Sequence, residues 1–467
     1  MLDSTSGFDP SDIQHGSSTS LSTSAFDHTS NQNHIAMQKE RKDLETNGES
    51  NVGKAHLWSL LAGVILLVLG NGLQTTLVGV RAGLEGMNGQ TVGLIMSAYF
   101  IGYAGGSVLS PRLIHVVGHI RAFAALAAVT SAIALCFPIL PLPFVWIGLR
   151  VIHGACYAGL VVIVESWLNA STTRNQRGRV LATYMVVLYA GWSLSQLLLN
   201  VASPRGFILF SLVSACLSLA LVPITATGIR APGIVTSSRL GLRALYAISP
   251  LAVVGAFMTG ATVSAFFGMG PTFAQSSGLT DIEISAFLAI MLVGALIFQW
   301  PLGWLSDRID RRFAIIGCAF ASFLIAIALW LTDQNIETLL ILSLLLGGTM
   351  MPIYSLCVAH ANDGIDAEHV VAAASEMILV YGIGSAFGPS LAGLAMNQLG
   401  PSGLFAFVGA GMAAYGFYAA FRVRQRAPIP GEEKQIYVAV PQTSHAALHL
   451  HRHGPDTIRD ARDHVSS

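Results

Sequence analysis

Two charged residues, Arg150 and Glu376, lie well inside long apolar stretches of this 467-residue sequence. A charge inside the bilayer costs about 3 kcal/mol or more unless it faces water or a partner, so such residues usually serve a function. Desolvation favours the protonated form of a glutamate, which suits Glu376 to load and release a proton. A guanidinium at Arg150 can bind an anionic group in a substrate cavity or tune a nearby carboxyl group. The alternatives are structural: Arg150 satisfies backbone carbonyls, and Glu376 bonds to Ser or Tyr neighbours or faces an inner vestibule.

Uncharged polar side chains also fall in the apolar stretches. The spacing of Asn71, Gln74 and Thr75 places all three on one face of a helix. They are candidates for binding a solute, together with Tyr157 and Tyr184. They serve equally well as hydrogen bonds between helices, worth about 0.6 kcal/mol each, and buried aromatic residues are more often packing residues. Both interpretations remain open at this point.

The elements that carry these residues are membrane-spanning helices. Hydrophobic residues make up 53% of the chain and charged residues 11%, against about 25% charged in soluble domains; the mean hydropathy is +0.61. Runs of roughly 20 apolar residues match the hydrocarbon thickness of a bilayer. The sequence therefore predicts an all-α membrane protein with twelve transmembrane helices, over residues 57–80, 90–113, 120–140, 142–168, 179–201, 205–227, 246–273, 282–306, 312–332, 336–361, 369–397 and 401–424.

The arginines predict the orientation. Basic residues in short connections stay on the cytoplasmic side, and most of them fall on the side that also carries both chain ends. One connection, 362–368, is acidic where a basic one is expected. We therefore expect a multi-pass inner-membrane protein with both termini in the cytoplasm. The arginines on the predicted cytoplasmic side are Arg112, Arg121, Arg174, Arg177, Arg179, Arg230, Arg239, Arg243, Arg308, Arg311 and Arg312.

The chain divides into five segments. Residues 1–56 and 425–467 are polar and are predicted to be disordered cytoplasmic tails. Residues 57–227 and 246–424 are predicted to form two six-helix halves, joined by a cytoplasmic linker at 228–245. A shift of about 193 residues superposes Gly191 on Gly384 and Gly154 on Gly347. Such an internal repeat predicts two pseudo-symmetric halves with a site at their interface.

Several classes of function are not supported by the sequence. The net charge is zero, with 25 basic and 25 acidic residues, so nothing indicates nucleic-acid binding. No phosphate-binding loop or nucleophile elbow is present, so we expect neither an enzyme nor a cofactor. The five cysteines show no paired spacing. His445, His449, His451 and His453 have metal-capable spacing, but adventitious binding is the favoured interpretation, so we expect no metal site.

A short turn between the eighth and ninth predicted helices suggests a family. Gly303, Asp307, Arg308, Arg311 and Arg312 resemble motif A of the major facilitator superfamily, and Asp310 stands where that family usually has glycine. The first-half counterpart, residues 111–121, lacks the acidic residue. Arg150 and the glycine after it, Gly154, resemble the helix-4 motif of the family. The segments 164–167, 174–179 and 299–303 are similar to its YcaD-like branch.

The resemblance implies the major facilitator fold and alternating access around a midplane cavity. By family analogy, Glu165 and the turn at 303–312 would form a cytoplasmic gate. Gly384, Gly388 and Pro389 resemble a Gly-Pro helix-packing signature that is typical of drug antiporters, although there it lies in the fifth helix. This signature slightly favours efflux.

We therefore expect a monomeric, proton-coupled secondary transporter of a small organic solute. A membrane sensor with a transporter fold and an uncoupled facilitator are the alternatives.

Overall fold

The computed structural model describes residues 57–170, 177–225, 241–332, 335–365 and 369–425. The predicted tails, the histidine-rich segment and most of the predicted linker lie outside these residues. Twelve helical segments in the described part are long and apolar enough to cross a membrane, which confirms the predicted all-α class. After a first helix, Leu57–Leu84, the elements follow in the order α2 Gly89–Val117, α3 His119–Cys136, α4 Pro143–Ala170, α5 Arg177–Leu197 with the 3₁₀ turn η2 Leu198–Val201, α6 Ile208–Leu219, α7 Leu221–Thr225, α8 Leu242–Ile248, α9 Pro250–Ser276, α10 Asp281–Arg308, α11 Arg311–Leu331, α12 Ile336–Met350, α13 Pro352–Asn362, α14 Val370–Leu399 and α15 Gly403–Val423.

Prolines lie at three of the places where the helices differ from the prediction. The third helix ends at Cys136, short of the expected residue 140, and Pro138, which has no backbone N–H to donate to a continuing helix, follows two residues later. The seventh span begins at Pro250 instead of 246, and α8 precedes it as a separate short helix. The tenth span divides at Pro352 into α12 and α13. A proline at the first turn of a helix loses no internal hydrogen bond, so it favours a new start.

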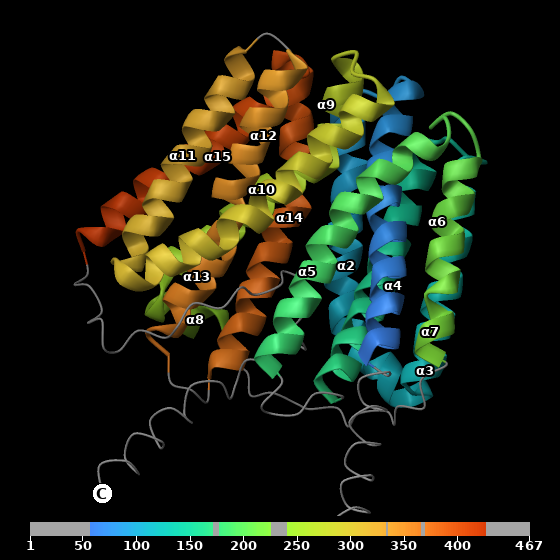
Figure 1. The fold of residues 1–467 in the computed structure, drawn as a ribbon, viewed down its shortest axis with the longest axis horizontal. Coiled ribbons are helices and arrows are strands. Elements are labelled where there is room, and N and C mark those ends of the chain that lie inside the picture. The colour runs from blue at the N-terminus through green and yellow to red at the C-terminus, as the bar shows by residue number, and fades with distance from the viewer. Residues whose placement is uncertain (1–56, 171–176, 226–240, 333–334, 366–368, 426–467) are drawn as a thin grey trace, which may run out of the picture. The chain divides into compact units, whose positions relative to one another are not determined.

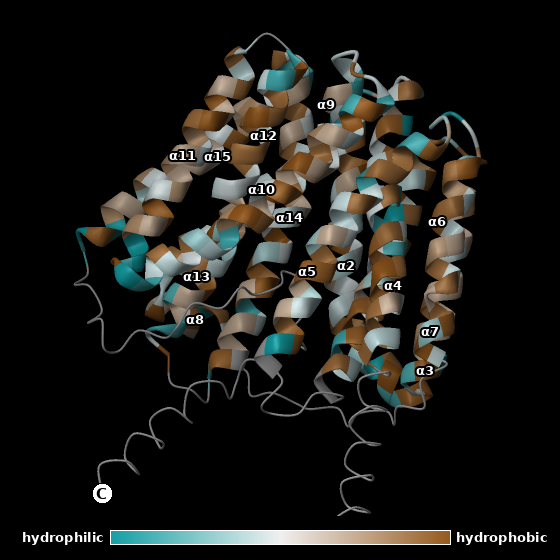
Figure 2. Cartoon of the chain, in the orientation of Figure 1, coloured by the Kyte–Doolittle hydropathy of each residue, from teal (hydrophilic) through white to brown (hydrophobic). Residues whose placement is uncertain are grey.

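The helices have apolar surfaces along their length and polar residues near their ends. Figure 2 shows this distribution, with hydrophilic residues gathered at the turns between helices. Large apolar side chains such as Phe144, Trp300 and Ile341 are more than 60% exposed. Exposed apolar surface of this kind is expected where lipid is the solvent.

We name the two ends of the helix bundle by the connections they carry. The outer end holds residues 85–88, 137–142, 202–207, 277–280 and 400–402, together with Thr332 and Asn335 at the facing ends of α11 and α12. The inner end holds the opposite connections, including the arginine-rich turn at 308–311, so the names follow the predicted orientation. The first six spans and the last six spans form two groups of helices, coloured blue to green and yellow to red in Figure 1.

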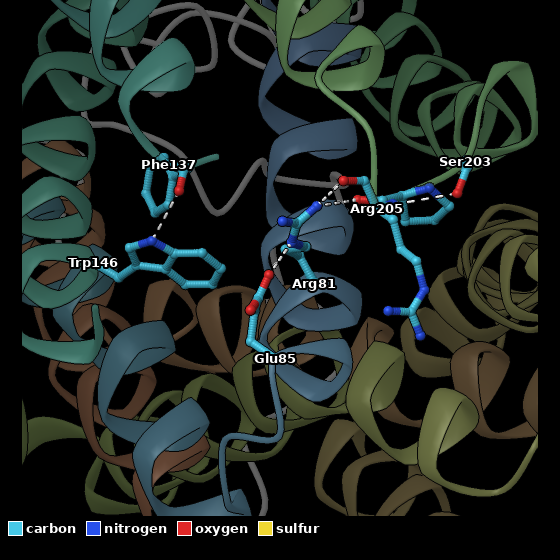
Figure 3. A network of polar contacts seen from close by, with 7 residues as sticks. Arg81, Glu85, Phe137, Trp146, Ser203 and Arg205 are labelled. Atoms are coloured by element: carbon cyan, nitrogen blue, oxygen red, sulfur yellow. Dashed lines mark hydrogen bonds and ion pairs between the residues drawn. The ribbon is translucent and has the colours of Figure 1, made fainter. Parts of the chain in front are cut away.

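Two polar contacts hold the outer connections of the first half (Figure 3). Arg81 lies at the end of the first helix, forms an ion pair of 2.6 Å with Glu85 and donates to the carbonyl oxygens of Pro204 and Arg205. The indole N–H of the buried Trp146 donates to the carbonyl oxygen of Phe137, 3.1 Å away. Both contacts satisfy backbone carbonyls where the helices end.

Glycines allow α2 and α4 to approach closely within the first half. A Cβ atom built on Gly102 would lie 2.0 Å from the carbonyl oxygen of Val151, and one on Gly154 would lie 2.0 Å from that of Tyr99. Gly106 makes a similarly close approach to Ala155. In the second half, Gly294 and Gly347 make the same kind of contact between α10 and α12. Small residues at such interfaces are the usual means of packing helices in a membrane.

A central cavity between the two halves

A cavity of about 880 Å³ lies between the two halves. The first helix, α2, α4 and α5 supply its walls from the first half, and α9, α10, α14 and the junction of α12 with α13 supply them from the second. The lining is mostly apolar and aromatic, with hydroxyl and amide groups between. The residues that line it are Val64, Leu67, Val68, Asn71, Gly72, Thr75, Thr76, Tyr99, Phe100, Tyr103, Ala104, Ser107, Val108, Pro111, Arg112, Tyr157, Val161, Val164, Tyr184, Leu188, Trp192, Gln196, Val263, Ser264, Phe267, Leu292, Met351, Ser375, Glu376, Ile378, Leu379, Tyr381, Gly382 and Ser385.

The cavity reaches the inner end of the bundle. Val108, 58% exposed, and Leu379, 40% exposed, line it near the inner ends of α2 and α14. Arg112, about one helical turn beyond Val108 on α2, is also exposed and also lines the cavity. Lining residues toward the outer end, such as Thr76 and Gln196, are buried, whereas those toward the inner end are exposed, so the cavity opens on the inner side.

The outer end, in contrast, is closed by contacts between the halves. On α2 and α14, the Ser390 hydroxyl lies 2.7 Å from that of Ser97, and the Ser390 N–H donates to the same Ser97 oxygen at 3.1 Å. Gly93 packs against the backbone of Pro389, where an added Cβ would lie 2.5 Å from the carbonyl oxygen. We call this contact between α2 and α14 the outer seam.

Further hydrogen bonds extend the closure on both sides of the outer seam. Thr272 on α9 donates to the carbonyl oxygen of Gly79 on the first helix, 3.2 Å away. Asn200 donates to the Ser285 hydroxyl at 3.1 Å, which joins η2 to α10. The cavity is therefore open at the inner end and closed at the outer end.

A buried polar cluster lies beside the cavity in the first half. The Asn71 side-chain oxygen accepts a hydrogen bond from the Tyr99 hydroxyl at 3.3 Å and lies 3.2 Å from His153 Nε2. Arg150 is 0% exposed, and its guanidinium lies 4.6 Å from the centre of the Tyr99 ring and 3.4 Å from the Met96 sulfur. A guanidinium over an aromatic face gains a cation–π attraction of about 2 kcal/mol when desolvated. The cluster therefore places a buried positive charge directly behind a cavity wall.

The predicted substrate residues divide between the lining and this cluster. Asn71, Thr75, Tyr157 and Tyr184 line the cavity. Gln74 and Arg150 do not; both are completely buried, and Gln74 Nε2 and Oε1 and Arg150 Nε and Nη1 have no hydrogen-bond partner among the described residues. Arg150 reaches the cavity only through Tyr99, whose ring separates the guanidinium from the space.

Glu376, the predicted proton carrier, lines the inner part of the cavity beside Ser375. It is partly exposed and lies on α14, about 10 Å from the inner end of that helix. Arg112 on α2 lines the same region. Glu376 and Arg112 are the only charged residues in the lining that the structure describes.

The residues predicted to form a gate make their observed contacts within their own halves. Glu165 is 0% exposed and accepts a hydrogen bond from the Tyr184 hydroxyl at 2.9 Å. Arg311 is 1% exposed and pairs with Asp307 at 2.8 Å and with Asp363 at 3.0 Å, which ties α10, α11 and the end of α13 together. These residues brace each half, and a latch between the halves remains a prediction.

The remaining residues of the turn have local roles. Gly303 is buried on the last turns of α10, and the Arg308 guanidinium lies 3.7 Å from the centre of the Trp304 ring. Asp310 is the N-cap of α11: its side chain accepts from the backbone N–H of Arg312 at 3.1 Å and pairs with the guanidinium of the same residue. An acidic N-cap stabilises a helix start by about 1 kcal/mol. This cap is a physical reason for an aspartate at position 310, where the resembling motif has glycine.

The glycines of the Gly-Pro signature lie in the second half, where α14 meets α9. A Cβ on Gly384 would lie 2.1 Å from the carbonyl oxygen of Phe257, and one on Gly388 would lie 2.0 Å from that of Ala261. Pro389 follows on the neighbouring face and contacts α2 at the outer seam. The signature therefore packs α14 against two helices.

Sequence reasoning missed several lining residues. Arg112 was used only as an orientation marker, and Gln196, Tyr381 and Ser385 were not singled out as candidates. Gln196 accepts a 2.5 Å hydrogen bond from Thr76 across the first half. A polar residue in an apolar run is a signal that was available, but the face it presents depends on helix rotation. In the described part of the chain, no group of three His, Cys, Asp or Glu residues is placed to hold a metal ion.

Comparisons with known proteins agree with this geometry. The family model described as "Major Facilitator Superfamily" matches residues 58–294 and 252–450. The "Uncharacterized MFS-type transporter YcaD" of Escherichia fergusonii is 27% identical over 351 residues, which are 75% of this chain and 91% of that protein. The "Uncharacterized MFS-type transporter YE1530" of Yersinia enterocolitica is 28% identical over 388 residues, 82% of this chain and 97% of that protein.

Solved structures share the fold at low sequence identity. The nucleoside transporter NupG has a TM-score of 0.65 and 13% identity, over 78% of this chain and 98% of that chain. A bacterial homologue of the human lysosomal transporter Spinster has a TM-score of 0.63 and 13% identity, over 81% of this chain and 97% of that chain. The resemblance inferred from the motifs is confirmed: this multi-pass membrane protein belongs to the Major Facilitator Superfamily and is similar to its YcaD-type transporters.

Proposed function

We propose that this protein is a secondary active transporter that moves a small organic solute across the inner membrane by alternating access. One observation carries the proposal: a cavity of about 880 Å³ between two six-helix halves is closed at the outer end and reaches the inner end. With both termini in the cytoplasm, as the arginines indicate, this arrangement is an inward-facing state. Residues 57–227 and 246–424 are the two moving halves in this proposal, joined by the segment 228–245.

The lining indicates the kind of solute. Ligand cavities of about 300–1,000 Å³ enclose molecules of drug-like size, so this one suits a solute of drug-like dimensions. Tyr99, Tyr103, Tyr157, Tyr184 and Tyr381 supply aromatic surface with hydroxyl groups. Such walls favour a partly apolar solute that carries a few hydrogen-bonding groups.

Proton coupling is proposed through Glu376. The carboxyl group lines the cavity and is partly exposed in the inward-facing state, so it can exchange a proton with the cytoplasm. Movement of the halves would then take this carboxyl group out of contact with the cytoplasm, as coupling requires. Arg150, held behind Tyr99, would supply a fixed positive charge to the midplane of the first half. Glu165 and the turn at 303–312 would stabilise the inner ends of their helices as the gate moves.

Proteoliposome uptake of a metabolite panel, with and without a pH gradient, tests the function. We first identify a solute by ligand-induced thermal stabilisation of the detergent-purified protein. We then expect its flux to respond to the gradient in the wild type. In Glu376→Gln, gradient-driven accumulation should be lost, while exchange of labelled for unlabelled solute without a gradient persists.

The outcomes separate the alternatives. Unchanged accumulation in Glu376→Gln would refute coupling through this residue, and transport that never responds to pH would favour a facilitator. Binding without any flux would favour a sensor. The sign of the gradient that drives accumulation decides the direction, for which the Gly-Pro signature slightly favours efflux.

A further inference from the structure

The two charged residues of the cavity lie on the two helices that form the outer seam. Arg112 is on α2 and Glu376 is on α14. Arg112 lies about four helical turns beyond Ser97, and Glu376 lies about four turns before Ser390, so both are about 20 Å from the Ser97–Ser390 hydrogen bond. The two residues are therefore at the same depth, near the inner end.

The helix faces on which the two side chains lie follow from the same residue separations. A separation of about four whole turns returns a side chain to nearly the same face of its helix. Arg112 and Glu376 thus lie on the faces of α2 and α14 that meet at the outer seam. Their presence in the lining of one cavity agrees with this placement.

Neither charge has a partner among the residues that the structure describes. Arg112 and Glu376 make no hydrogen bond or ion pair with any residue that the structure describes, and the cavity lies between them. Other charges near the inner end, such as Arg311 with Asp307 and Asp363, are already paired within one half. Two unpaired opposite charges on facing helices would attract each other if the inner ends approached.

We propose that Arg112 and Glu376 form an ion pair between the halves that closes the inner end of the cavity in the outward-facing state. The inference rests on the alternating access proposed above. When the halves rotate, the outer seam opens and the inner ends of α2 and α14 come together, which brings guanidinium and carboxylate into contact. The pair would stabilise the outward-facing state and has no equivalent in the inward-facing one, so it biases the conformational equilibrium.

A reporter at the outer seam measures this bias. In a cysteine-free background of the full chain in right-side-out cells, Ser390→Cys places one thiol in the seam. A membrane-impermeant maleimide added outside labels it only when the seam opens. An ion pair of about 1 kcal/mol corresponds to about a fivefold change in an equilibrium. We therefore expect Arg112→Glu and Glu376→Arg each to slow labelling about fivefold.

The charge-reversed double variant Arg112→Glu with Glu376→Arg is the decisive one. It places the negative charge on α2 and the positive charge on α14, so the two side chains attract each other again. Labelling should therefore return to within about twofold of the background rate. Arg121→Glu is the matched control, because Arg121 is exposed at the inner end of α3 and does not line the cavity. It carries the same change of charge and should leave labelling unchanged.

Two results would overturn the ion pair. Single variants that label at the background rate, or a double variant that is slower than either single one, would contradict it while leaving alternating access intact. If the background protein is never labelled, the result contradicts alternating access, and with it the proposed ion pair. Should a charge reversal prevent folding, a cross-link between Arg112→Cys and Glu376→Cys replaces it: formation under conditions that label the seam supports the pair, and its absence refutes it.

Discussion

Replacing Gly154 with alanine tests whether close packing of α2 and α4 holds the cavity wall in place. The added Cβ would lie 2.0 Å from the carbonyl oxygen of Tyr99 and 2.9 Å from the backbone N–H nitrogen of Tyr103. Ordinary contacts begin at 3.4 Å, so the backbones of α2 and α4 would have to move apart to relieve the clash. A backbone carbonyl inside a helix cannot turn away as a flexible side chain can.

The expected change in stability of Gly154→Ala combines two opposing effects. Overpacking of this kind costs about 3 kcal/mol, the upper part of the usual range. Alanine in place of glycine inside a helix recovers about 1 kcal/mol. We therefore expect Gly154→Ala to destabilise the protein by about 2 kcal/mol.

Gly148 on the same helix is the matched control. No atom lies within 4 Å of a Cβ built there, so Gly148→Ala keeps the gain in helix propensity and adds no clash. The difference between the two variants removes the propensity term and leaves the clash, about 3 kcal/mol. It corresponds to about 5 °C in apparent melting temperature.

The assay is thermal unfolding of the detergent-purified variants, followed by tryptophan fluorescence. Melting temperatures of Gly154→Ala and Gly148→Ala that agree within about 1 °C would refute the packing argument. Because Tyr99 lines the cavity and is bonded to Asn71, Gly154→Ala should also weaken ligand stabilisation. Gly148→Ala should not.

Two further substitutions probe contacts within the halves. Arg311→Ala removes the guanidinium that pairs with Asp307 and Asp363. It should lower the melting temperature strongly, because removing one partner of an ion pair whose side chains are 1% and 2% exposed costs about 3 kcal/mol. Trp146→Phe keeps the aromatic packing but removes the hydrogen bond to the Phe137 carbonyl oxygen, and it should cost about 1–2 kcal/mol in the same assay.

Each of these has a control on the same kind of side chain. Arg308→Ala removes a neighbouring guanidinium that stacks on Trp304 at the surface, so its effect should be about 1 kcal/mol or less. Trp58→Phe changes an indole that is 65% exposed and should leave the melting temperature unchanged. If Arg311→Ala and Arg308→Ala lowered the melting temperature equally, the buried ion pairs of Arg311 would not be stabilising the second half.

The twelve spans and the family could be read from local sequence because their causes are local. A run of about 20 apolar residues suffices to cross a bilayer whatever it packs against. The turn Gly303–Arg312 is a contiguous motif, so its residues are recognisable without knowledge of their partners. The breaks at Pro250 and Pro352 were also local signals, although the predicted boundaries did not use them.

The candidate site was harder to predict from the sequence because it depends on how helices that are distant in the chain rotate and tilt. Asn71 and Gln74 share a helix face by spacing, yet only Asn71 lines the cavity. Arg150 was expected in the cavity, but the close approach of α2 through Gly102 and Gly154 brings the Tyr99 ring over the guanidinium. The rotation of each helix about its own axis decides such matters, and no local pattern encodes it.

By itself, then, the sequence determined that the protein is a twelve-helix membrane transporter of the Major Facilitator Superfamily, because hydrophobic length and a contiguous motif are properties of short segments. Only the tertiary structure decided which side chains line the cavity, which end of it is open, and that Arg112 and Glu376 face the same space. Those features arise from contacts between helices that are far apart in the chain, and so they exist only once the two halves are packed together.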